Sequence, residues 1–140
     1  MVHLIIMAHA ELANSFVVCV KHILAKEINN LHTVSVKKTD SIEHILEKSS
    51  HMINTIGIEN EILILTDIFG ATPSNIANKL LIKNKVELIT GLNLPMLIRA
   101  ISYAHLGLDI CIAKSISGAI DGVIHVTGDG VNAKKTSTNY

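Results

Sequence analysis

Two polar side chains follow apolar segments of this sequence and could do chemistry together. His9 comes soon after the apolar residues 2–7, and Asp67 comes directly after the largely apolar residues 61–66. If both segments are neighbouring strands of a parallel sheet, these side chains face one another across a crevice at its carboxyl edge. A carboxylate that bonds one nitrogen of a histidine ring fixes its tautomer and leaves a lone pair on the other nitrogen. We therefore predict that His9 is a nucleophile toward phosphorus and that Asp67 orients it.

The loop after the third predicted strand could bind a phosphoryl group. Gly70 lets the backbone approach closely, Thr72 offers a hydroxyl and can cap a helix, and Pro73 suits the first helical position. A helix that begins there would direct the free amides of Ser74 and Asn75 toward the crevice, because helix N-termini attract anions. The predicted phosphate-binding residues are therefore Thr72, Gly70 and Ser74.

The surrounding sequence alternates between predicted strands and helices. Strands are expected at residues 2–7, 33–36, 61–66 and 86–90, and helices are expected after residues 14–15, 40, 72 and 91–93, with Asp40 capping the second helix. This alternation predicts an α/β fold of three layers, with helices on both faces of a parallel sheet. Three segments leave strands at the carboxyl edge of that sheet, namely residues 8–10, 67–74 and 91–95. Residues 124–126 can add a short strand, and residues 127–140 are expected to form a mobile C-terminal tail.

The composition argues against several classes of partner. Lys plus Arg and Asp plus Glu both total 12, so no charge excess predicts binding to nucleic acid or to an anionic membrane surface. The apolar start of the chain is shorter than a secretory signal, and no apolar stretch approaches a membrane span, so we expect a cytoplasmic protein. Cys19 and Cys111 are isolated and are expected to be reduced core thiols. The histidines other than His9 lack metal-ligand spacing and are expected on the solvated surface, so neither a metal nor a cofactor is predicted.

Longer motifs carry a resemblance to a known family. The first strand that leads to His9, the segment LILTDIFGATPSNIANKL and the segment ELITGLNLPMLIRA together resemble the mannose-type EIIA domain of the phosphoenolpyruvate-dependent sugar phosphotransferase system. The resemblance covers residues 1–126. It implies a four-stranded parallel sheet of order 2-1-3-4, a homodimer, and a C-terminal strand that can be exchanged between subunits.

The same resemblance implies a function and partners. His9 would accept a phosphoryl group from phospho-HPr and pass it to an EIIB component for carbohydrate uptake. Asp67 would orient His9, and Thr72 would contact the phosphate. The protein would have no direct membrane insertion, but it could associate with a membrane EIIC/EIID complex. The family usually has glycine at the positions of Ala10 and Ala71, and both methyl groups would lie near the phosphate path.

Other functions were weighed against this one. A regulatory protein of an incomplete phosphotransferase system would use the same His9 chemistry without sugar transport, and the sequence leaves that alternative open. An aspartyl-phosphate mechanism at Asp67 would need a second acid beside it to hold Mg²⁺, and the following residues supply none. The phosphocarrier domain of dihydroxyacetone kinase systems matches the residues around Asn93 less well.

Overall fold

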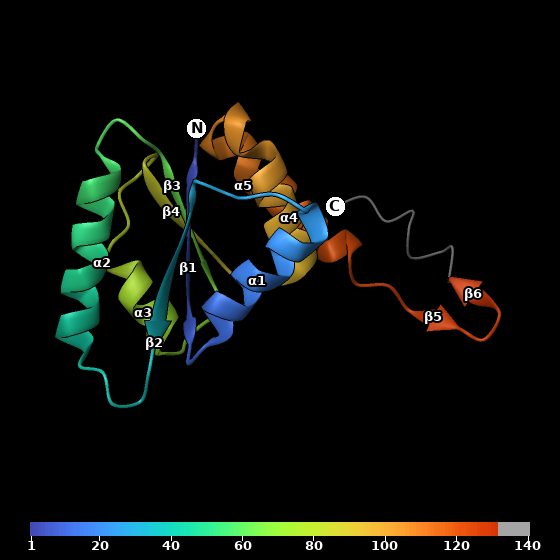
Figure 1. The fold of residues 1–140 in the computed structure, drawn as a ribbon, viewed down its shortest axis with the longest axis horizontal. Coiled ribbons are helices and arrows are strands. Elements are labelled where there is room, and N and C mark those ends of the chain that lie inside the picture. The colour runs from blue at the N-terminus through green and yellow to red at the C-terminus, as the bar shows by residue number, and fades with distance from the viewer. Residues whose placement is uncertain (132–140) are drawn as a thin grey trace.

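A parallel sheet lies between two helical layers in the computed structural model, which describes residues 1–131 (Figure 1). The sheet consists of β1 (His3–His9), β2 (Leu31–Val36), β3 (Ile62–Thr66) and β4 (Val86–Thr90), in the order β2-β1-β3-β4. The helices are α1 (Leu12–Leu24), α2 (Ile42–Ile56), α3 (Thr72–Asn78), α4 (Leu94–Tyr103), the 3-10 turn η1 (Ala104–Leu106) and α5 (Leu108–Asp121). The predicted fold class and strand order are confirmed.

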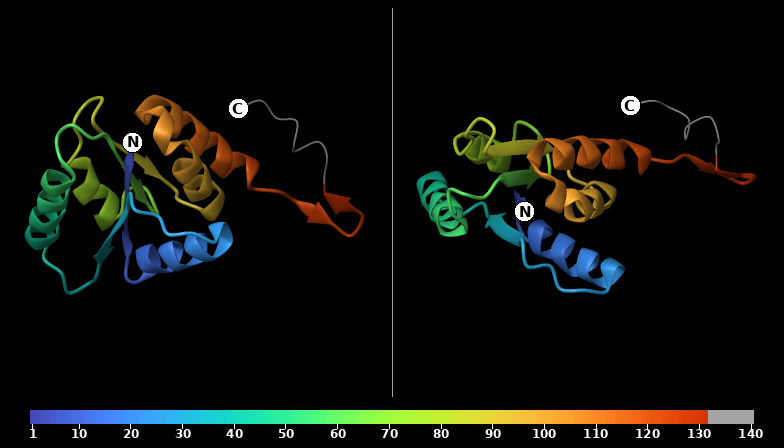
Figure 2. Two further views of the ribbon diagram at one scale, coloured as in Figure 1. Left: turned by 45° about the horizontal axis from the view of Figure 1, so that its top comes forward. Right: turned by 90° about the horizontal axis from the view of Figure 1, so that it is seen from above.

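Alternating side chains of β1 serve two separate cores. Leu4 and Ile6 pack in the cluster that α1, α4 and α5 cover, whereas Ile5 and Met7 pack in the cluster that α2 and α3 cover. Successive strand residues point to opposite faces, so a strand with helices on both sides must be apolar throughout. This is why the central strands are continuous apolar runs. Figure 2 shows the two helical layers from further directions.

The central position of β1 brings distant segments to one edge of the sheet. Met7 pairs in parallel register with Val34 of β2 and with Thr66 of β3. Further along, His9 pairs with Val36. The carboxyl ends of β1, β2 and β3 therefore meet at the lower edge in Figure 1.

Two helix starts differ from their predictions by one or more residues. Helix α1 begins at Leu12, so Asn14 lies in its first turn and donates to the Glu11 carboxylate instead of capping. The N-cap of α2 is Ser41, whose hydroxyl accepts the His44 amide hydrogen at 3.0 Å. The carboxylate of Asp40, the predicted cap, instead accepts the hydrogen of a backbone amide in the preceding turn.

The C-terminal part of the described chain forms a small hairpin. The two-residue strands β5 (Val126–Thr127) and β6 (Gly130–Val131) pair antiparallel. The hairpin projects away from the sheet and its helices (Figures 1 and 2). Only the last residue of the strand predicted at 124–126 is extended in this way. Of the predicted tail at 127–140, residues 132–140 lie outside the described residues.

Further side-chain predictions have mixed outcomes. Cys111 is buried as expected, but Cys19 is exposed on α1, so its assignment to the core was wrong. His3 and His32 are partly buried and stack with ring centroids 5.4 Å apart, so these two histidines are not solvated surface residues. Within residues 1–131, no helix combines the length and apolar character needed to cross a membrane.

Candidate functional site

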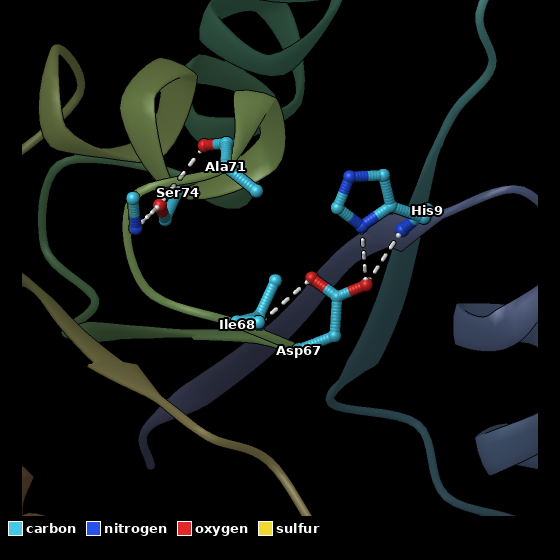
Figure 3. A network of polar contacts seen from close by, with 6 residues as sticks. His9, Asp67, Ile68, Ala71 and Ser74 are labelled. Carbon is cyan, nitrogen blue, oxygen red and sulfur yellow. Dashed lines mark hydrogen bonds and ion pairs between the residues drawn. The ribbon is translucent and has the colours of Figure 1, made fainter.

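The two side chains that the sequence singles out are in direct contact (Figure 3). His9 is the last residue of β1, and Asp67 follows β3 directly. The Nδ1 atom of His9 lies 2.7 Å from Asp67 Oδ2, and the His9 backbone amide donates to the same oxygen at 3.0 Å. The other carboxylate oxygen accepts the Ile68 amide hydrogen at 3.0 Å. Hydrogen bonds from the end of β1 and from the loop after β3 thus fix the carboxylate.

The electrostatics of this contact define the tautomer of His9. Burial acts to raise the pKa of Asp67, but the hydrogen bonds from the His9 amide, the His9 ring and the Ile68 amide outweigh it and lower that pKa. Asp67 is therefore ionised at neutral pH and can only accept hydrogen bonds. The neutral His9 ring accordingly carries its proton on Nδ1, which leaves the lone pair on Nε2. The His9 side chain is 48% exposed, so reactants can reach the ring.

A pocket of about 630 Å³ opens beside His9. Its lining residues come from the ends of β1 and β2, the β2–α2 loop, α2 and α3: His9, Ala10, Val36, Lys37, Lys38, Asp40, Ser41, Ile42, Ile45, Thr72 and Ile76. Of the predicted phosphate-binding residues, only Thr72 lines this pocket. Thr72 is the first residue of α3, and the N-cap position is Ala71, so the predicted capping role of Thr72 was wrong. The Thr72 side chain is exposed and lines the same pocket as His9.

Gly70 and Ser74 build the loop between β3 and α3. Gly70 has a φ of +84°, a conformation that glycine adopts without strain, and its amide donates to Ser74 Oγ at 2.9 Å. Ser74 Oγ donates in turn to the Ala71 carbonyl at 3.0 Å, and Ser74 is 3% exposed (Figure 3). The Asn75 amide bonds to the Ala71 carbonyl at 3.0 Å, so the prediction that it is free was wrong. Both hydrogen bonds of the Ser74 hydroxyl are therefore made within the loop.

Ala10 and Ala71, the two alanines expected near the phosphate path, lie in different backbone conformations. Ala10 has a φ of +51°, in the left-handed region that disfavours a side chain. Ala71 has a φ of −92° and a ψ of 174°, which is extended backbone open to any residue. Only the methyl group of Ala10 therefore carries a conformational cost, and Ala10 also lines the pocket.

Two lysines of the pocket were missed by sequence reasoning. Lys37 and Lys38 follow β2, which pairs with β1, and both line the pocket with His9. The signal was available, because the second strand was predicted and its carboxyl end had to reach the same edge. Conversely, the third predicted segment, residues 91–95, does not line this pocket. Asn93 instead caps α4 by accepting the Met96 amide hydrogen at 2.9 Å.

The described chain contains no built metal site. Among residues 1–131, no three or more histidine, cysteine, aspartate or glutamate side chains are grouped to hold a metal ion.

Comparison with known proteins identifies the family. The family model described as "PTS system fructose IIA component", EIIA-man, matches residues 3–115. The chain belongs to this family. It is 36% identical over 77 residues to the fructose-specific EIIA component of Bacillus subtilis (strain 168), a match that covers 54% of the chain and 53% of that protein. It is 30% identical over 96 residues to the sorbose-specific EIIA component of Lacticaseibacillus casei, covering 68% of each. The chain thus spans about half the length of the first of these relatives.

Solved structures of EIIA proteins share the fold of this EIIA-man family member. The mannose/sorbose-specific IIA subunit from Enterococcus faecalis superposes with a TM-score of 0.81 at 24% identity, covering 89% of the chain and 94% of that subunit. The EIIA component from Streptococcus agalactiae superposes with a TM-score of 0.80 at 24% identity, covering 89% and 97%. Proteins of different sequence therefore build the same sheet.

Proposed function

We propose that the chain is a phosphocarrier that accepts a phosphoryl group from phospho-HPr on His9 and passes it to an EIIB component for carbohydrate uptake. One observation carries this proposal. The 2.7 Å contact between His9 Nδ1 and Asp67 Oδ2 holds the ring with its second nitrogen free, on a half-exposed side chain at the mouth of a pocket. Membership of the EIIA-man family supports the same reading.

The transfer step forms one N–P bond and breaks another, and it needs no general base. The Nε2 lone pair of His9 attacks phosphorus and forms the new N–P bond, while the N–P bond of the donor phosphohistidine breaks and its electron pair stays on the donor ring. The His9 proton remains on Nδ1, where the Asp67 carboxylate stabilises the positive charge that the ring gains. Reversal of these steps toward an EIIB nucleophile discharges the carrier. Positioning and electrostatics therefore supply most of the catalysis.

The remaining predicted residues take separate roles in this proposal. Thr72 lines the pocket with His9, and its hydroxyl is proposed to donate to a phosphoryl oxygen. Gly70 and Ser74 are proposed to hold the loop that places Asp67 and Thr72, because their own bond ties up the Ser74 hydroxyl. Phosphate binding by Gly70 and Ser74 would then be indirect.

Phosphoryl transfer in vitro tests the assignment of His9. The protein is mixed with phosphoenolpyruvate, EI and HPr, and its intact mass is read under alkaline conditions that preserve phosphohistidine. We expect one added phosphoryl group on the wild type and on His44→Ala, an exposed histidine control, but none on His9→Ala. Added EIIB should then remove the group. An unmodified wild type, or modification that survives His9→Ala, contradicts the proposal.

The contribution of the carboxylate is tested with Asp67→Asn. The amide keeps the size of the side chain but loses the charge that stabilises the phosphorylated ring, and it can hold the wrong tautomer. We expect the rate of phosphorylation by phospho-HPr to fall by about 10²- to 10⁴-fold, the range found when an orienting carboxylate is lost. Rapid-quench kinetics measure this rate. An unchanged rate at an unchanged melting temperature would show that Asp67 only shapes the loop.

A further inference from the structure

The pocket beside His9 holds charges that the proposed transfer has not yet used. A phosphoryl group carries about −1.5 to −2 charge near neutral pH. On His9 it would lie close to the Asp67 carboxylate, and Asp40 also lines the pocket. Like charges within a few ångströms repel unless cations lie nearby. Lys37 and Lys38 are the lysines among the lining residues.

The backbone fixes both lysines next to His9. Val36, the last residue of β2, pairs with His9 in parallel register, and its carbonyl accepts the Ala10 amide hydrogen at 2.9 Å. The turn that follows is closed on itself. The Lys37 amide donates to Asp40 Oδ2 at 2.8 Å, and the Asp40 amide donates to the Lys37 carbonyl at 3.1 Å. The lysine backbone is therefore anchored to the end of β1.

The two lysines differ in what their ammonium groups contact. Lys37 Nζ lies 3.6 Å from Glu11 Oε1, just before α1, which covers the opposite face of the sheet from α2 and α3. Lys38 has no ion-pair partner within residues 1–131. It lies two residues beyond Val36, whose side chain packs on the face covered by α2 and α3. Of the two, Lys38 is the lysine free to meet a new anion in the pocket.

We propose that Lys38 binds the phosphoryl group carried by His9 and serves as its counter-charge. This inference rests on the proposed function of His9. The flexible stem of lysine lets a point charge approach phosphoryl oxygens from the pocket wall, and an N⁺–H···O⁻ bond is stronger than a neutral one. Asp67 neutralises the phosphorylated ring from the β3 side of His9, while Lys38, which follows β2, neutralises the phosphoryl oxygens from the other side. Unmodified His9 offers Lys38 no anion, so the contact stabilises the phosphorylated form alone.

Phosphorus NMR of the phosphorylated protein tests this contact. A nearby cation favours the dianion, so removing it should raise the second pKa of the phosphoryl group by about 0.7 unit, the shift expected for one charge at ~4 Å in an aqueous dielectric. The comparison uses wild type, Lys38→Gln and Lys38→Arg, with Lys37→Gln and the exposed α2 variant Lys48→Gln as matched controls. We expect the shift in Lys38→Gln only. The phosphohistidine of Lys38→Gln should also hydrolyse at a rate different from that of the wild type, and Lys38→Arg should show the wild-type rate.

The possible outcomes separate this inference from the proposed function. A wild type that takes no phosphoryl group, read first by intact mass, overturns both. A phosphorylated wild type whose phosphorus titration is the same in Lys38→Gln overturns the role of Lys38 alone. If Lys38→Gln only slows transfer from phospho-HPr and leaves the titration unchanged, Lys38 binds the partner protein, and the inference is again overturned. A shift of equal size in Lys37→Gln or Lys48→Gln would show a general charge effect and would also contradict it.

Discussion

Among single residues, Ala10 combines an unfavourable backbone with a position directly after His9. Its φ of +51° costs an L-residue about 1–2 kcal/mol, whereas glycine pays no such cost but loses more entropy on folding. We therefore expect Ala10→Gly to raise the free energy of unfolding by about 0.5–1 kcal/mol, measured by urea denaturation.

The control for Ala10→Gly is Ala113→Gly, at an exposed position inside α5. There the same change removes a good helix former and should lower the free energy of unfolding by about 0.5–1 kcal/mol. Opposite signs for the two variants would identify the backbone at Ala10 as strained. A loss of stability in both would contradict the left-handed conformation.

The predicted catalytic pair was easier to find than its surroundings. His9 and Asp67 could be placed because His9 stands at the end of one apolar segment and Asp67 directly follows another, and parallel strands bring such positions together. Ser74 was predicted to bind phosphate, but the sequence could not show that its hydroxyl accepts the Gly70 amide hydrogen, because such a hydroxyl can bond to the loop or to a ligand with equal chemical ease. Lys38 could have been found, because the predicted order places the second strand beside the first, but a lysine in a loop carries no local pattern that separates it from other solvated lysines.

At the level of elements, β1 and β2 are linked outside the site by a histidine pair. His3 Nδ1 lies 3.1 Å from His32 Nε2 between the two strands. Burial lowers the pKa of both rings. The charge of the amino terminus lowers the pKa of His3 further, and His3 in turn lowers that of His32. One ring must donate and the other accept, so at least the accepting ring must be neutral, and the contact is lost when both rings are protonated.

This pair predicts a loss of stability in mild acid. A histidine whose pKa is lowered on folding binds its proton more readily in the unfolded chain, so stability is full above about pH 6.5 and falls as pH drops toward the folded pKa. The urea concentration at the midpoint of unfolding of the wild type should therefore decrease as the pH is lowered from 7.5 to 5.5. His32→Gln should reduce that slope, whereas the exposed His51→Gln should leave it unchanged. Equal slopes in all three proteins would contradict the role of the pair.

Element boundaries were predictable only where the sequence offered one choice. β4 is identical to its prediction, because apolar residues end at a glycine turn. The start of α2 was one residue off because Asp40 and Ser41 can both cap. In the closed turn that follows β2, the Asp40 carboxylate already accepts a backbone amide hydrogen, so Ser41 caps α2 instead. Local pattern could not rank these two competing hydrogen bonds.

At the scale of the whole molecule, the strand order explains why the site lies where it does, and it leaves β2 and β4 at the two edges of the sheet. Order β2-β1-β3-β4 puts β1 and β3 together at the centre, so His9 and Asp67 meet at the switch in strand order. It also makes β4 an edge, since within residues 1–131 this strand is paired in the sheet only with β3. Exposed sheet edges are normally covered. The projecting hairpin is a candidate cover when it is exchanged between subunits.

Exposed apolar side chains around the hairpin predict a dimer. Val123 is 70% exposed, Ile124 is 45% exposed and Val126 is 63% exposed in the single chain. We expect light scattering during gel filtration to give twice the chain mass for the wild type. The double variant Ile124→Asp/Val126→Asp should give a monomer, because burying two carboxylates in an interface costs more than the apolar contact returns. Ile58→Asp, at a loop residue that is 87% exposed elsewhere on the surface, should remain a dimer. A monomeric wild type at micromolar concentration, or a double variant that still dimerises, would rule out this hairpin as the contact between subunits.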